Sequence, residues 1–216
     1  MLTTKPKGIH LLKPVVATQA LFAVALSALL QAPPVVAKGE LHNLSAPSEI
    51  IETKIENKIF QTSKILIKTR PEVVWKILTD YNNADAIFNN LKDCGLVEDK
   101  GHKKVVRHEV QPTGLPGRFK YTLEITETPN HMLEWHRVRG DFREVDGYWK
   151  LEPADGGKHT LATYSAYING GLFLPPPLVK RQIRVDMPIV LATLKKEAEN
   201  RVQTQIAGRP DKHTND

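Results

Sequence analysis

Hydrophobic and polar residues alternate along the middle of the chain, most clearly between residues 118 and 127. There Phe119, Tyr121, Leu123 and Ile125 share one face, and lysine, threonine and glutamate occupy the other. A period of two is typical of a strand with one buried face. Comparable segments predict five more strands, at 94–98, 104–111, 132–139, 147–152 and 159–168. Because short turns join most of these strands, the sheet should be antiparallel.

The segment before this series predicts one long strand followed by two short helices. β-branched residues are frequent between 55 and 68, which favours a first strand there. Pro71 suits the first position of a helix, and Glu72 suits its positive end. Apolar residues at helical spacing follow as far as Tyr81, and a second short helix is predicted at 84–88.

The last element is a helix predicted from about 178 to 206. Val190, Leu191, Leu194 and Ala198 mark its apolar face, and charged residues mark the other. Pro188 should either kink this helix or begin a second one with Asp186 as its N-cap. The helix is the only predicted element long enough to cover the sheet. The polar tail at 207–216 should be disordered.

The first 37 residues have the pattern of a secretory signal peptide. Three lysines precede an apolar run from residue 15 to 30, and Val35 and Ala37 fit the small-residue positions of a cleavage site. An uncleaved membrane anchor is the alternative. Residues 38–49 then form a leader. Without residues 1–37 the net charge falls from +6 to +3, which argues against a nucleic-acid partner. Export, to the periplasm, is expected.

Few residues suggest covalent or metal chemistry. Cys94 is the only cysteine, so no intrachain disulfide can form. No serine lies in a nucleophile motif, and His131 and His136 do not have a zinc spacing, so no metal or cofactor is expected. General acid–base catalysis by groups in an apolar pocket remains an open hypothesis. The alternative is that these groups are solvated charges on the faces of strands. The candidates are His108, Glu109, His136, Arg137, Asp141 and Arg143.

The order of elements and several short motifs resemble the START-like, or helix-grip (SRPBCC), superfamily. The motifs are Pro-Glu-Val-Val-Trp at 71–75, Thr-Asp-Tyr at 79–81, Gly-Asp-Phe-Arg at 140–143 and Gly-Tyr-Trp-Lys-Leu-Glu-Pro at 147–153. Residues 161–164 and the proline-led final helix complete the resemblance. Within the superfamily, the chain is similar to the polyketide cyclase/dehydrase and coenzyme-Q-binding START families.

This resemblance implies an α+β fold in which a curved antiparallel sheet wraps around the C-terminal helix, here a domain at 50–206. It also implies an apolar cavity for a lipid, quinone, sterol or polyketide. Only some members of these families are enzymes, so the resemblance does not imply catalysis.

Aromatic residues on the helices and strands are the main candidates for the cavity wall, with Arg137 as a polar contact and two leucines of the last helix. The predicted ligand-binding residues are Trp75, Tyr81, Phe88, Phe119, Tyr121, Trp135, Arg137, Phe142, Trp149, Tyr164, Leu191 and Leu194. For each aromatic residue taken singly, an ordinary place in the core is the alternative.

These observations favour an exported, non-catalytic carrier of an apolar small molecule. A cyclase- or dehydrase-like enzyme with acid–base residues in the same cavity is the second hypothesis. The third is an accessory protein that docks on a partner or membrane without a ligand. The apolar loop from Leu172 to Pro177, with Phe173 and Leu174, could contact a membrane surface or pack on the core as a hinge. The pattern does not indicate an oligomeric state.

Overall fold

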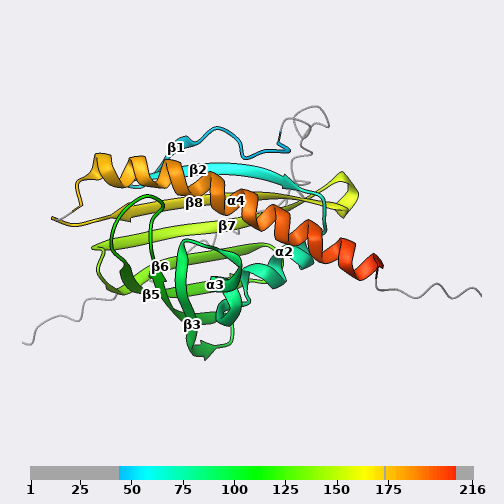
Figure 1. The fold of residues 1–216 in the computed structure, drawn as a ribbon, viewed down its shortest axis with the longest axis horizontal. Coiled ribbons are helices and arrows are strands. Elements are labelled where there is room, and N and C mark those ends of the chain that lie inside the picture. Colours follow the sequence, from blue (N-terminus) through cyan, green and yellow to red (C-terminus); the bar gives the residue numbers. More distant parts are fainter. Residues whose placement is uncertain (1–43, 173, 208–216) are drawn as a thin grey trace, which may run out of the picture. The chain divides into compact units, whose positions relative to one another are not determined.

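The computed structural model describes residues 44–172 and 174–207. They form an eight-stranded antiparallel sheet, two short α-helices and a long C-terminal helix (Figure 1). The strands are β1 (Ile51–Ile55), β2 (Lys58–Ile67), β3 (Leu91–Lys100), β4 (Lys103–Val110), β5 (Phe119–Thr128), β6 (Met132–Gly140), β7 (Glu144–Ala154) and β8 (His159–Asn169). The α-helices are α2 (Pro71–Leu78), α3 (Ala84–Ile87) and α4 (Pro176–Ala207), with single 3-10 turns at Tyr81–Asn83 and Asp155–Gly157.

The strands follow the order β1-β2-β8-β7-β6-β5-β4-β3 across the sheet. From β3 to β8 each strand pairs with the next along the chain, and β2 closes the series beside β8. Helix α4 crosses one face of this curved sheet, and α2 and α3 lie on the same side (Figure 1). The predicted α+β helix-grip fold is therefore confirmed, including the six antiparallel strands after the short helices.

Two local predictions need correction. The long first strand predicted at 55–68 is β2, which begins at Lys58, and the sequence missed β1 before it; Ile55 pairs with Lys58 in the hairpin, and Glu56 adopts a left-handed φ of 52°. Of the two alternatives for Pro188, a second helix beginning there is wrong, because α4 is continuous through it and Asp186 lies inside the helix rather than capping it. Its carboxylate instead accepts hydrogen bonds from the Thr113 N–H and the Gln182 amide.

Some predictions concern residues outside the described ranges. They are the signal peptide at 1–37, the first part of the leader, Phe173 and the tail from 208 onward. The second part of the leader is described and runs along β2. Ser48 N–H donates to the Lys64 carbonyl oxygen at 2.7 Å, and Leu66 N–H donates to that of Leu44 at 2.8 Å.

Helix α4 is fixed to the sheet at both ends because charged side chains flank its apolar face. Near its C-terminal end, Lys195 Nζ donates to the Leu66 carbonyl oxygen at 2.7 Å, and Glu199 accepts from Lys68 N–H at 2.8 Å. Near its N-terminal end, Lys180 forms an ion pair with Glu52 of β1. Between these ends, Met187, Leu191, Leu194 and Ala198 are fully or almost fully buried at helical spacing.

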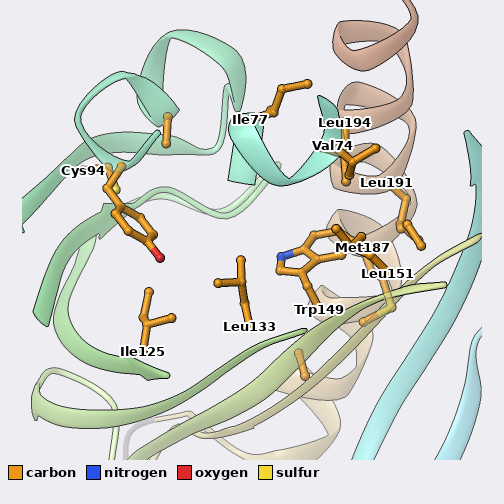
Figure 2. Packing of buried hydrophobic residues seen from close by; sticks show 14 of the residues in the cluster. Val74, Ile77, Cys94, Ile125, Leu133, Trp149, Leu151, Met187, Leu191 and Leu194 are labelled. Carbon is orange, nitrogen blue, oxygen red and sulfur yellow. The ribbon is translucent and has the colours of Figure 1, made fainter. Parts of the chain in front are cut away.

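The two halves of α4 meet different surroundings. Figure 2 shows Leu191 and Leu194 facing Val74 of α2, above Trp149 and Leu151 of β7. This part of the core is filled by side chains. The half of α4 before Val190 instead covers empty space, which defines the candidate site.

Candidate ligand-binding cavity

Two adjoining chambers lie on the inner face of the sheet, the first under the N-terminal half of α4 and the second beside α2, α3 and β3. Their volumes are about 140 Å³ and about 190 Å³, and they share seven lining residues. The first is called the outer chamber and the second the inner chamber. The residues lining both are Asn90, Val110, Tyr121, Tyr164, Ala166, Ile168 and Val190. Because so many residues line both chambers, we treat them as one elongated cavity.

The outer chamber lies between α4 and the loop that joins β4 to β5. Pro112 and Leu115 of that loop face Ile183 and Met187 of α4 across it. Phe119 stacks on Phe142 with ring centroids 5.0 Å apart, and the Tyr121 ring lies 5.5 Å from Phe142. This end of the cavity therefore has an aromatic floor and an aliphatic roof.

The inner chamber is lined by aromatic rings from strands in the middle of the sheet. Trp149 of β7 and Tyr164 of β8 are directly opposite each other and stack with centroids 4.3 Å apart. The Trp135 ring lies 6.0 Å from Tyr164. Gly147 makes room for this indole, because a Cβ there would lie 2.4 Å from Trp135 Cζ2. The alternation of residue size along β7 thus shapes the chamber wall.

Several side chains carry polar atoms on this wall: His108, Tyr121 and Tyr164, together with Tyr81, Asn90, Cys94 and the indole N–H groups of Trp135 and Trp149. His108 and Tyr121 are opposite each other on β4 and β5, and their rings meet edge to face at 5.4 Å. Burial lowers the pKa of His108 to about 4, so its imidazole is neutral at neutral pH. Burial raises the pKa of Tyr164 to about 12 and that of Tyr121 above its usual value, so both hydroxyls keep their protons.

Two other titratable groups of the inner chamber are held in their neutral forms. Burial raises the pKa of the Cys94 thiol to about 12, which leaves almost no nucleophilic thiolate. Burial and a hydrogen bond to Glu127 raise the pKa of Tyr81, whose hydroxyl donates to Glu127 Oε1 at 2.6 Å. None of the described residues that line the inner chamber therefore carries a charge at neutral pH.

The structure places eight of the twelve predicted ligand-binding residues on the cavity wall. They are Tyr81, Phe88, Phe119, Tyr121, Trp135, Phe142, Trp149 and Tyr164. The other four lie elsewhere. Trp75 packs against the core from α2, and Leu191 and Leu194 are fully buried in it. Arg137 Nε donates to the Arg143 carbonyl oxygen at 2.9 Å, which fixes the β6–β7 turn.

The acid–base candidates are dispersed, and only His108 lines the cavity. Glu109 pairs with Arg118 at 3.0 Å, and Asp141 accepts from the Lys120 backbone N–H at 2.6 Å. His136 is exposed on the opposite face of the sheet from Trp135. Within residues 44–172 and 174–207, no three His, Cys, Asp or Glu side chains are grouped so that they could hold a metal ion.

Sequence reasoning named Val190 on the apolar face of the last helix, and this residue lines both chambers. It missed Leu178, Val179, Ile183 and Met187, which line the outer chamber. These residues share one helix face, so their spacing could have found them. Asn90 and Asp186 were also missed, and no pattern in the sequence singles them out.

Comparisons with known proteins agree with this geometry. A family model for polyketide cyclase / dehydrase and lipid transport matches residues 67–195. The chain belongs to this family. Its sequence finds no match among curated proteins. None of the described helices has the length and apolar character needed to cross a membrane.

Several solved START-like structures share the fold. The Zhui aromatase/cyclase from Streptomyces sp. R1128 is 16% identical, with 69% of this chain and 97% of that one covered and a TM-score of 0.61. A STAR-related lipid transfer protein from Xanthomonas axonopodis is 16% identical, with 69% and 92% covered and a TM-score of 0.57. A START superfamily protein from Mycobacterium smegmatis is 18% identical, with 68% and 98% covered and a TM-score of 0.54. At these identities the similarity concerns the fold alone.

Proposed function

We propose that the protein reversibly binds an apolar small molecule, such as a lipid, quinone or polyketide-like compound, and carries it without changing it. The observation that supports this most is the cavity, whose wall is mainly aliphatic and aromatic and which lies under one half of α4. Its two chambers together reach the lower end of the range of about 300–1,000 Å³ that is typical of small-molecule sites. Membership of a family that includes lipid transport is consistent with this function.

Binding without catalysis is favoured over a cyclase- or dehydrase-like activity by the state of the polar groups. General acid–base catalysis needs a group whose pKa lies near the working pH. His108 titrates well below neutrality, and both tyrosines titrate well above it. The carboxylate of Asp186, which lines the outer chamber, already accepts hydrogen bonds from Thr113 and Gln182.

The proposed function is tested with protein purified under mild conditions from its native host. We expect native mass spectrometry to show extra mass that is lost on denaturation, and solvent extraction to release an apolar compound of that mass. The extracted compound, incubated with apo-protein, should be recovered unchanged. Protein that neither carries nor takes up any apolar compound would contradict the proposal, and conversion of the compound would support the enzyme hypothesis.

We also propose that the loop after β8 brings the cavity to a membrane surface. Leu172 in this loop is 95% exposed, although leucine is usually buried, and the exposed cationic residue Arg143 lies beside the neighbouring Gly171. Co-sedimentation with phosphatidylglycerol vesicles should decrease in Leu172→Asp and be unchanged in Lys64→Asp, which changes charge on the opposite face of the sheet. Equal sedimentation of both variants and the parent would refute this contact.

A further inference from the structure

Three hydrogen-bonding side chains of the inner chamber differ from Tyr81, whose hydroxyl donates to Glu127. Among the described residues, neither the His108 ring nor the Tyr121 and Tyr164 hydroxyls form a hydrogen bond to another residue. Of the buried hydroxyls, Thr62 and Ser165 lie 2.7 Å apart and Thr160 donates to the Thr69 carbonyl oxygen at 2.6 Å, whereas Thr163 Oγ1 has no partner. His108, Tyr121 and Tyr164 are half-buried and line the cavity, so a polar atom of a ligand can take the place of water beside them.

These three side chains face the same space from two sides. His108 and Tyr121 come from the neighbouring strands β4 and β5, and Tyr164 comes from β8, on the other side of β6 and β7. All three line the inner chamber, and both tyrosines also line the outer one. Both tyrosines therefore lie where the two chambers meet, with His108 in the inner chamber, so one ligand can contact all three side chains.

The chemistry of the wall restricts what this end of the ligand can be. Among residues 44–172 and 174–207, no Lys, Arg, Asp or Glu side chain lines the inner chamber, so a buried carboxylate, phosphate or ammonium would have no counter-ion from them. Burying an unpaired charge is far more costly than burying a neutral polar group. Phenol hydroxyls and a neutral imidazole can instead donate to, or accept from, an uncharged oxygen.

The stacked rings add a restriction on shape. Trp149 and Tyr164 lie nearly parallel, with an interplanar angle of 14°, and Trp135 continues this aromatic surface. A flat ring packs on such a surface more completely than a flexible chain does. A ligand on this side of the chamber can thus contact the aromatic rings and also form a hydrogen bond with the Tyr164 hydroxyl.

We propose that the inner chamber selects an uncharged, oxygen-bearing ring system, held by hydrogen bonds from His108, Tyr121 and Tyr164. This inference rests on the proposed carrier function and narrows its ligand class. A free fatty acid, or another ligand with a charged end, would therefore not bind with that end in the inner chamber. Any charged or extended part of the ligand lies outside the inner chamber.

Three probes that share one ring system test the inference: anthracene, 9-anthracenemethanol and 9-anthracenecarboxylate. Their binding to the mature protein is measured at pH 7.4 through intrinsic tryptophan and probe fluorescence. We expect the alcohol to bind at least about ten-fold more tightly than the carboxylate, and more tightly than the hydrocarbon, since one net hydrogen bond corresponds to about two- to ten-fold in affinity.

Variants then separate hydrogen bonding from stacking. Tyr121→Phe and Tyr164→Phe keep the rings and should each weaken binding of the alcohol about two- to ten-fold, with little change for the hydrocarbon. Tyr167→Phe is the matched control, because this tyrosine packs on Phe60 on the other face of the sheet and should change neither affinity. Melting temperatures are recorded for all variants to establish that each is folded.

The outcomes distinguish this inference from the proposed function. If all three probes bind equally, the cavity is an unselective apolar site. If the carboxylate binds best, the cavity accepts a charged group. Either result refutes selection of an uncharged oxygen. Equal losses for the alcohol and the hydrocarbon in the Phe variants would also refute it. If no probe binds and no compound is extracted from the native protein, the carrier function fails and this inference fails with it.

Discussion

Val190 and Leu194 lie one helical turn apart on α4 but have different neighbours. Val190 lines both chambers, whereas Leu194 is fully buried among side chains of α2 and the sheet. A tryptophan at position 190 can occupy empty volume. A tryptophan at 194 must displace packed atoms, and such overpacking typically costs about 1–3 kcal/mol.

We therefore expect Val190→Trp to abolish or strongly weaken binding of a fluorescent lipid while its melting temperature stays close to that of the parent. Leu194→Trp is the matched control and should lower the melting temperature by several degrees. Calorimetry and ligand titration on the same samples measure both quantities. Strong destabilisation by Val190→Trp would mean that the space under α4 is filled in solution.

His108 should make the stability of the protein depend on pH. Its pKa is lowered to about 4 by burial, whereas in the unfolded chain it returns to about 6.5. Between these values the unfolded state binds a proton that the folded state does not, so stability decreases as pH falls from about 6.5 to about 4. At pH 5 the loss can reach about 2 kcal/mol.

Urea unfolding at pH 7 and pH 5 measures this loss. His108→Gln should show a smaller decrease between the two pH values, since the remaining histidines contribute equally in both proteins. An identical decrease in the two proteins would mean that His108 is protonated in the folded state.

Aromatic residues were the part of the site that the sequence predicted well. Large rings alternate with polar residues on the predicted strands, so their common face could be assigned from the alternation alone. The pattern could not show which part of the interior is filled by side chains and which part is empty. Leu191 and Val190 are neighbours on one apolar helix, and only the packing of α2 determines which of them meets a void.

The loop between β4 and β5, residues 111–118, is held against α4 by a small group of hydrogen bonds. Thr113 N–H donates to Asp186 Oδ1 at 3.1 Å, and Gln182 Nε2 donates to the Thr113 carbonyl oxygen at 3.0 Å. Pro112 and Leu115 of this loop form part of the outer chamber. Release of the loop would therefore widen the route to the cavity.

We expect Asp186→Ala to increase the rate of ligand dissociation several-fold, because a charge-assisted hydrogen bond contributes about 1.5–3 kcal/mol. Stopped-flow transfer of a fluorescent ligand to vesicles measures this rate. Arg181→Ala, an exposed change on the same helix, is the control. If both variants release ligand at the parent rate, the loop does not limit exchange.

At the level of elements, the sequence failed where the deciding residue is an unusual one for its conformation. The β1–β2 turn contains no glycine or proline, and Glu56 adopts a left-handed conformation that is uncommon for glutamate. Nothing in the pattern marks a break there. At Pro188 the sequence instead suggested a possible second helix where the structure has none. Burial of Met187 and Leu191 on either side keeps the helix continuous.

For the whole molecule, the order of elements predicted an antiparallel sheet covered by the last helix, and the resemblance of this order and the short motifs to the START-like superfamily predicted the helix-grip fold. An antiparallel sheet with one apolar face needs cover, and only the final helix is long enough to provide it. Pairing of β2 with β8, which are nearly a hundred residues apart, follows from that arrangement rather than from any local signal.

We propose that the mature protein acts in the cell envelope after export and cleavage behind Ala37. The lysine-rich start, the apolar run and the small residues Val35 and Ala37 support this. N-terminal sequencing of protein from its native host should begin at Lys38. Recovery of the full chain, beginning at Met1, from the cytoplasm would refute export.

Pro188 also affects how amide protons exchange with solvent. Proline has no N–H, so the usual hydrogen bond to the carbonyl oxygen of Arg184 cannot form. The turns before it rest on a cavity, and the turns after it rest on a filled core. Deuterium should therefore enter residues 178–187 through local opening well before residues 191–201, whose exchange requires global unfolding. The lifetime of the bound ligand would then be set by this local opening, with the rest of the domain remaining folded.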